Sequence, residues 1–143
     1  MLIEGLNALL TGASSITAIV GTSATRSDKT TGVWAGQMKE GTPMPDVVIS
    51  ESPGGETLMT MEGPDALRFR RYQFSCYAKS YLAAKQLAAA VRTVLENFTG
   101  ELEDGSIVQN MQTTTEFDTF EEDAFIYHTP LEVSIACIEN TED

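Results

Sequence analysis

The sequence has little of what catalysis, metal binding or membrane insertion requires. It contains one histidine and two cysteines among 143 residues. It has no Gly-x-Ser-x-Gly elbow, Walker loop or Gly-x-Gly-x-x-Gly fingerprint. No apolar run approaches the length of a membrane span, and the N-terminus lacks the basic region and cleavage pattern of a secretory signal. These absences disfavour enzymes, membrane proteins and secreted proteins, and they predict no cofactor.

The histidine and the cysteines all fall in strand-like segments. His128 precedes Glu132 by four residues, and strand residues at that spacing lie about 13 Å apart, too far to share a metal ion. His128 is therefore interpreted as a structural or exposed histidine. Cys76 and Cys137 have apolar neighbours, which predicts reduced core thiols in a cytoplasmic product. A disulfide between their two strands is also compatible with the sequence.

Basic residues are scarce and unevenly placed. The net charge of −12 argues against binding nucleic acid through its phosphates. Six of the nine basic residues lie between Arg68 and Arg92, and 13 acidic but no basic residues follow Arg92. The acidic segments are either solvated loops or sites where copies of the chain join head to tail, basic strand against acidic loop. The residues of such a contact would be Arg68, Arg70 and Arg71 on one side and Glu116, Asp118, Glu121, Glu122 and Asp123 on the other.

Two carboxylate-rich segments also suggest a cation site. They hold Glu101, Glu103 and Asp104 before Gly105, and Glu116 and Asp118 before Glu121–Asp123. Such oxygen ligands suit a hard cation such as calcium, but neither spacing matches the calcium-loop motif. No neighbouring group would shift a carboxylate pKa for acid–base catalysis. We therefore predict neither metal ligands nor catalytic residues.

The strongest periodic pattern is a strand followed by a helix. Over Ala66–Lys79 apolar and polar residues alternate, as in a strand with one buried face. The phase changes at Arg70 and Arg71, which predicts a bulge or an exit from the sheet. From Tyr81 apolar residues recur every three or four positions to Phe98, which predicts an amphipathic helix. We expect Ser80 to cap this helix and Gly100 to terminate it.

The remaining patterns are shorter. They predict a helix at Leu2–Leu10 and a second helical turn capped by Ser14 or Ser15 and closed by Gly21. Strands are expected at Val33–Ala35, Asp46–Ser52, Ser106–Thr114 and Phe125–Ile138, and a hairpin arm at Glu56–Glu62. The remaining segments are expected to be an acidic loop at Thr115–Asp123, a flexible loop at residues 23–32 and a frayed tail at 140–143. Pro130 lacks an N–H, which suggests a sheet edge or a bulge. Trp34, Lys39, Glu56 and Glu62 lie in or beside loops suited to contacts, although Trp34 is most simply a packing anchor.

These elements predict one α+β domain over residues 1–143. Adjacent strands joined by short turns favour an antiparallel or mixed sheet, with one long amphipathic helix packed on a face and a short N-terminal helix.

Three segments together resemble the tail completion family of long-tailed bacteriophages. They are Gly41–Ser50 (GTPMPDVVIS), Met61–Leu95 (MEGPDALRFRRYQFSCYAKSYLAAKQLAAAVRTVL) and Tyr127–Ile135 (YHTPLEVSI). The similarity extends over roughly Leu6 to Ile138. Its elements are the opening helix ending at Val20-Gly21, Pro43-x-Pro45 before a strand, the turn Glu62-Gly63-Pro64, the aromatic strand with Cys76, and Ser80-Tyr81 before the alanine-rich helix. The order and spacing of these short elements carry the resemblance, and the Thr22–Gly32 segment departs from it.

The resemblance implies a structural protein with no active site. Such proteins have a small α+β sandwich fold and form a ring, usually of six copies, which ends the tail tube and joins it to the stopper below the DNA-filled head. The implied partners are further copies, the tail tube protein and a head-completion or stopper protein, with DNA passing through the lumen unbound and no membrane contact. The implied location is the head-proximal end of the virion tail, and the host cytoplasm during assembly.

The physical pattern is compatible with such a ring. A ring needs a heterologous interface, for which the divided charge is suited. An acidic loop facing the lumen would repel DNA phosphates. The rival hypotheses are a head-side adaptor or stopper subunit, an acidic protein that mimics DNA, and, least supported, a small ferredoxin-like enzyme.

Overall fold

The computed structural model describes residues 2–21, 32–36, 45–51, 58–59, 68–116, 118–121 and 126–138. In chain order its elements are α1 (Leu2–Thr11), α2 (Ser14–Val20), β1 (Val33–Ala35), β2 (Asp46–Glu51), β3 (Leu58–Met59), β4 (Arg68–Ala78), α3 (Tyr81–Glu96), β5 (Gly100–Glu101), β6 (Ile107–Glu116), β7 (Thr119–Glu121) and β8 (Ile126–Ile138). The expected flexible loop, except Gly32, and the expected tail at 140–143 lie outside these residues.

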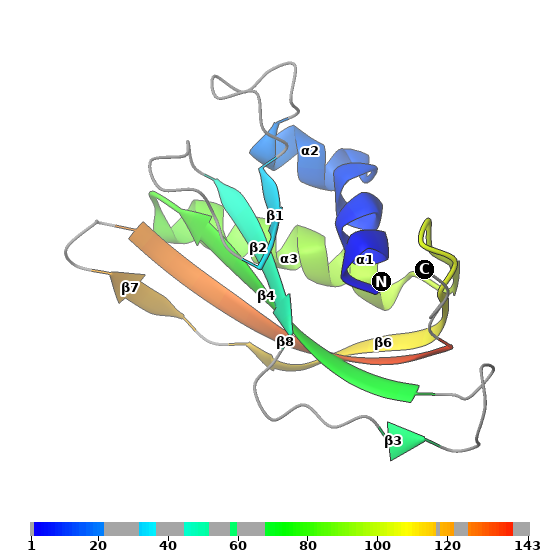
Figure 1. Cartoon of the computed structure of the whole chain (residues 1–143). Helices are drawn as coiled ribbons and strands as arrows, with labels where there is room; N and C mark the ends of the chain where they lie inside the picture. Colours follow the sequence, from blue (N-terminus) through cyan, green and yellow to red (C-terminus); the bar gives the residue numbers. More distant parts are fainter. Residues whose placement is uncertain are drawn as a thin grey trace.

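The strands form one curled mixed sheet (Figure 1). Its order is β1-β2-β4-β8-β6-β5, with β3 beside β4 and β7 beside β8. Strands β1 and β2 pair in parallel, and the other neighbours pair antiparallel. The long strands β4 and β8 pair in continuous register from Arg68 opposite Cys137 to Ala78 opposite Tyr127. The predicted α+β class and the mixed alternative for the sheet are therefore confirmed.

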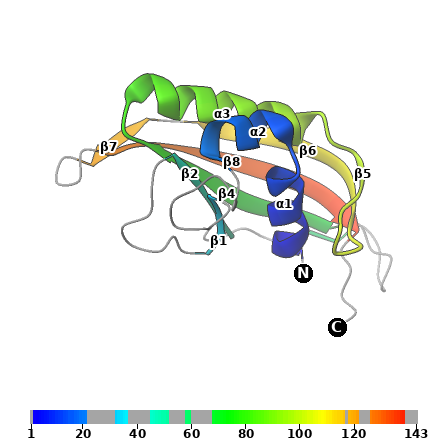
Figure 2. The same cartoon turned by 90° about the horizontal axis from the view of Figure 1, so that it is seen from above.

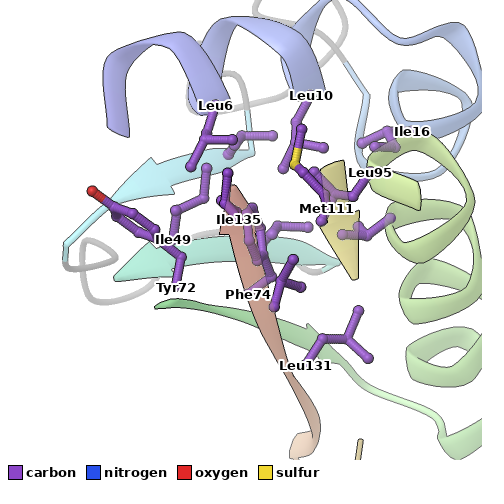
Figure 3. Packing of buried hydrophobic residues seen from close by; sticks show 14 of the residues in the cluster. Leu6, Leu10, Ile16, Ile49, Tyr72, Phe74, Leu95, Met111, Leu131 and Ile135 are labelled. Carbon is purple, nitrogen blue, oxygen red and sulfur yellow. The ribbon is translucent and has the colours of Figure 1, made fainter. Parts of the chain in front are cut away.

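The helices pack on one face of this sheet, which we call the covered face (Figure 2). The alternation of β4 and β8 directs every second side chain to that face, where Phe74 lies opposite Leu131 and both are fully buried. Side chains of the three helices complete the same cluster, as Figure 3 shows for Leu6, Leu10, Ile16 and Leu95. The opposite surface of β4 and β8, which we call the open face, carries mainly polar residues of β4 between Arg71 and Tyr77.

The predicted long helix is present as α3, 16 residues long. The Ser80 hydroxyl accepts a hydrogen bond from the Ala83 backbone N–H at 3.1 Å, as the capping prediction requires. Of the expected stripe from Ala84 to Phe98, five residues are buried, whereas Val94 and Phe98 are partly buried and Phe98 lies beyond the end of the helix. The expected terminator is wrong, because the helix ends at Glu96 and Gly100 begins β5, where its φ of 124° suits glycine.

The described residues contain three helices rather than one long helix and one short N-terminal helix. The second helical turn is a separate seven-residue helix, α2, which forms a pair with α1 bent by 77°. Its N-cap is Ala13 rather than a serine, and the predicted Gly21 closes it by donating its N–H to the Thr17 carbonyl. No single described helix is long and apolar enough to cross a membrane; the α1–α2 pair reaches that length only across its bend.

The bulge expected at Arg70 and Arg71 is wrong. Both residues lie in the uninterrupted register of β4 with β8. What changes is the strand that neighbours β4 on its other side: β2 ends at Glu51, opposite Tyr72, and β3 pairs with residues 68 and 69. The change in the sequence pattern therefore coincides with a change of neighbouring strand rather than with a kink.

Two expectations for the last third of the chain are also corrected. Pro130 lies in a central strand, paired with Ser75, but on its other side β6 ends opposite Leu131 and β7 begins opposite His128. The missing N–H of the proline thus falls beside a gap between two neighbouring strands. The acidic loop expected at Thr115–Asp123 is partly strand, because β6 extends to Glu116 and β7 spans Thr119–Glu121.

The two cysteines are buried and neither forms a disulfide. Cys76 lies opposite Thr129, eight residues along β8 from Cys137, so the thiols are separated by roughly 26 Å of strand. Burial raises the pKa of the Cys76 thiol far above its ordinary range, and the nearby Glu116 carboxylate acts in the same direction. The prediction of reduced core residues is confirmed.

Candidate interaction surfaces

A cluster of charged side chains fastens α3 to the end of β6. The Lys85 ammonium donates to Glu116 at 2.9 Å and to Asp118 at 3.2 Å, and Arg92 donates to Glu116 at 3.1 Å. The Tyr81 hydroxyl donates to Asp118 at 3.1 Å. The positions come from the helix period, because Tyr81, Lys85 and Arg92 are separated by steps of four and seven residues, which keeps them on one side of α3. Two of the acidic residues expected at a subunit contact are thus paired within the chain.

The pairing shifts two pKa values in opposite directions. The hydrogen bond to Glu116 raises the pKa of Lys85, with a contribution from Asp118, against partial desolvation. Desolvation would raise the pKa of Asp118, but the hydrogen bonds from Lys85 and Tyr81 outweigh it, so the pKa is lowered. The side chain of Asp118 is 42% exposed, so solvent screens this attraction.

Arg70 and Arg71 point to opposite faces of the sheet, because neighbouring strand residues alternate. Arg70 lies on the covered face and pairs with Glu51 at 3.6 Å. Arg71 lies on the open face, 57% exposed, and pairs with Glu132 at 3.7 Å. A flat partner surface therefore cannot contact both guanidinium groups. Whether either one meets a neighbouring copy stays a prediction.

Several sequence-predicted residues fall outside the described part of the chain. They are Lys39, Glu56, Glu62, Glu122 and Asp123. For Arg68 and Glu121 only the strand position is described. Trp34 is described on β1, where its indole N–H donates to the buried Asp46 carboxylate on β2 at 3.3 Å. This bond supports the interpretation of Trp34 as a packing anchor, and its role in contacts stays a prediction.

His128 lies on the open face and stacks on Tyr77, with ring centroids 4.3 Å apart and planes 8° from parallel. Within the described ranges, no three histidine, cysteine, aspartate or glutamate side chains are grouped as metal ligands. Asp104 instead accepts hydrogen bonds from the Ser106 hydroxyl at 2.7 Å and the Ser106 N–H at 3.2 Å. The arrangement stabilises the turn before β6.

An exposed apolar surface that sequence reasoning missed lies at the start of α3. Tyr81 is 51% exposed, Leu82 is 66% exposed and Phe120 of β7 is 42% exposed. Tyr127 of β8 joins them, with ring centroids 6.0 Å from Tyr81 and 4.6 Å from Phe120. We call the three rings of Tyr81, Phe120 and Tyr127 the aromatic patch; the exposed Leu82 is the next residue of α3 after Tyr81. In the sequence, only Leu82 indicates this exposed apolar surface, because it is apolar but does not belong to the buried stripe of α3.

A groove lies at the other end of the strands, between α1 and the segment around β5. Its volume is about 120 Å³, and we call it the acidic groove. Its lining residues are Gly5, Ala8, Leu9, Phe98, Glu101, Leu102 and Glu103. Gly5 allows the close approach that shapes it, because a Cβ there would lie 2.9 Å from Leu102 Cβ and still closer to the Asp104 carboxylate.

Comparison with known proteins identifies a family that this chain matches and a solved structure of similar fold. The family model described as "Tail completion protein gp17" matches residues 4–137. The chain belongs to this family of tail completion proteins. A search of curated proteins finds no match. A chain of the solved structure titled "Virion of native gene transfer agent (GTA) particle" is similar in fold, with a TM-score of 0.69, 17% identity, and coverage of 96% of this chain and 95% of that one.

Membership of the tail completion family makes this chain a structural tail protein of a phage-type virion. A structural tail protein acts through contacts with other proteins, so its surface is expected to carry binding sites for them. The described residues supply three candidates: the open face with Arg71, the aromatic patch and the acidic groove.

Proposed function

We propose that this tail completion protein is a ring-forming terminator subunit, which ends the tail tube and joins it to the head connector. The observation that carries the proposal is the family match over residues 4–137. The partners are further copies of the chain, organised as the six-copy ring that the family resemblance implies, together with the tube protein and a head-completion or stopper protein.

The charge supports this proposal. A ring at the head–tail junction surrounds DNA that must pass without adhering, and a subunit with a net charge of −12 repels phosphate. A closed ring also requires that each subunit present two different surfaces to its two neighbours. The aromatic patch and the acidic groove are two such surfaces, at opposite ends of the strands.

The test is electron microscopy of a lysate from phage lacking this gene, with the gene supplied on a plasmid as the control. We expect filled heads beside unattached tails, particularly overlong or ragged ones, and normal virions in the complemented control. Empty or leaking heads with normal free tails would instead assign the protein to the head side, as an adaptor or stopper. Intact, infectious virions without the gene would refute both roles and favour the DNA-mimic hypothesis.

A further inference from the structure

The aromatic patch and the acidic groove lie at opposite ends of the same strands. Ala78, at one end of β4, pairs with Tyr127 of the patch, whereas Arg68 at the other end pairs with Cys137, beside β6 and β5. Strand β4 has 11 residues and therefore spans about 35 Å. Figure 2 shows the same separation, with β7 and the start of α3 at one end and β5 at the other. Neither surface can reach the other within one molecule.

Three charged residues at these ends lack a partner within the described chain. Lys79 follows β4 directly and is exposed beside the aromatic patch. Within the described ranges, it forms no hydrogen bond or ion pair, and neither do Glu101 and Glu103 in the acidic groove. The basic side chains Arg70, Arg71, Lys85 and Arg92, by contrast, all pair with carboxylates of their own chain. An unpaired cation thus lies at one end and two unpaired carboxylates at the other.

The apolar character of the two ends also matches. Leu82 is the most exposed of the large apolar side chains described, and it lies three residues after Lys79 at the start of α3. Apolar residues, among them Ala8, Leu9 and Phe98, line the acidic groove together with the two glutamates. Its volume of about 120 Å³ is close to that of an apolar cavity of about 150 Å³ that holds a benzene molecule, so the groove has room for one inserted side chain.

We propose that the end of one copy that carries the acidic groove binds the end of a second copy that carries the aromatic patch, Leu82 and Lys79. Leu82 enters the groove, and the Lys79 ammonium lies between the carboxylates of Glu101 and Glu103. The contact joins two different surfaces, so a bound pair leaves one patch and one groove available for further copies, as a ring requires. This inference rests on the proposed ring and names the surface that builds it, in place of the pairing of Arg70 and Arg71 with the acidic loop.

The first experiment measures self-association of the purified chain by analytical ultracentrifugation. We expect the native chain to associate. In 1 M salt, where the screening length falls to about 3 Å, the difference in association between the native chain and Lys79→Glu should become smaller. Lys79→Glu and the double variant Glu101→Lys/Glu103→Lys should each weaken association by about tenfold or more, because like charges then face each other. Leu82→Ser should also weaken it without loss of stability, because Leu82 is 66% exposed. Arg71→Glu is the matched control: it makes the same charge change on the open face and should associate as the native chain does.

The second experiment mixes Lys79→Glu with Glu101→Lys/Glu103→Lys in equal amounts. Each variant alone brings like charges together. In the mixture, Lys79 of the double variant meets the native carboxylates of the single variant. The glutamate introduced at position 79 meets the two introduced lysines, so every contact in an alternating ring joins opposite charges. We therefore expect the mixture to recover association that neither variant shows alone.

A native chain that stays monomeric, a Lys79→Glu variant that associates normally, or a mixture without recovery would each overturn this contact. Weakening by Arg71→Glu alone would point to the open face instead. The lysate experiment remains independent, because a tail defect on gene loss does not depend on which surface joins the copies. Failure of the contact and failure of the proposed function are therefore distinguishable.

Discussion

The two faces of β4 and β8 show how differently adjacent residues of one strand can contribute. On the covered face, Phe74 lies opposite Leu131 and both side chains are fully buried. One residue earlier on β4, Gln73 lies opposite Glu132 on the open face, and its side-chain amide donates to the Ser75 hydroxyl at 3.0 Å. The covered face supplies the apolar burial that stabilises the fold, and the open face supplies polar pairs near solvent.

This difference separates the residues that maintain the fold from those available for assembly. Substitutions on the covered face should act through stability, because cavities in a packed core are costly. Substitutions on the open face and at the ends of the strands should leave the fold intact and act, where they act, on contacts. The effect of a substitution on unfolding therefore tests the assignment of each residue to one of these two groups.

The largest effect is expected for Phe74→Ala. Removing this buried ring leaves a cavity in the core and should lower the free energy of unfolding by about 3–5 kcal/mol. Gln73→Ala, at the adjacent position on the open face, is the matched control; it removes one partly buried hydrogen bond to Ser75 and should lower the free energy of unfolding by only about 1 kcal/mol. Urea denaturation followed by circular dichroism measures both. Similar losses for the two variants would contradict the division between the faces.

An intermediate effect is expected for Glu116→Gln, which weakens the cluster that fastens α3 to β6. Because its side chain is 23% exposed and pairs with both Lys85 and Arg92, we expect a loss of about 1 kcal/mol. Glu101→Gln, which removes a carboxylate without an intrachain partner in the described residues, should leave unfolding unchanged. Urea midpoints at neutral pH compare the two variants, and equal midpoints would show that the cluster adds no net stability.

The same cluster predicts a pH dependence. The lowered pKa of Asp118 means that its contribution is complete above the ordinary aspartate value, about 4, and is lost as pH falls through the lower folded-state value. The raised pKa of Lys85 means that its contribution is complete below the ordinary lysine value, about 10.4, and is lost as pH rises through the higher folded-state value. Urea denaturation across pH should therefore show a constant difference in stability between the native chain and Lys85→Met between these limits, and a smaller one beyond them.

The sequence predicts the features that depend on neighbouring residues. The period of two along β4 and β8 and the three-to-four spacing of α3 arise directly from which side of each element is buried, so these elements are recognisable. Ser80 is recognisable as a cap because its partner, Ala83, lies three residues away. Elements of this kind need no knowledge of the tertiary arrangement.

The features that the sequence does not predict depend on distant segments. Lys85 and Glu116 are 31 residues apart, so their pairing follows only from the packing of α3 against β6. The aromatic patch likewise joins the start of α3 to β7 and β8. The sequence assigns Pro130 to an edge or a bulge because no local pattern shows that a gap between two strands accommodates it. Some of the acidic residues predicted to contact another subunit, namely Glu116 and Asp118, therefore pair with Lys85 of their own chain.

The smallest effect is expected for the ion pair between Arg71 and Glu132 on the open face. The nitrogen–oxygen distance is 3.7 Å and the Arg71 side chain is 57% exposed, so solvent and salt screen the attraction. A double-mutant cycle with Arg71→Ala and Glu132→Ala should give a coupling free energy below about 0.5 kcal/mol, measured by urea denaturation in low salt. A coupling well above about 1 kcal/mol would exceed what exposed pairs contribute. The open face would then also stabilise the fold, and its polar residues could no longer be regarded as available for contacts.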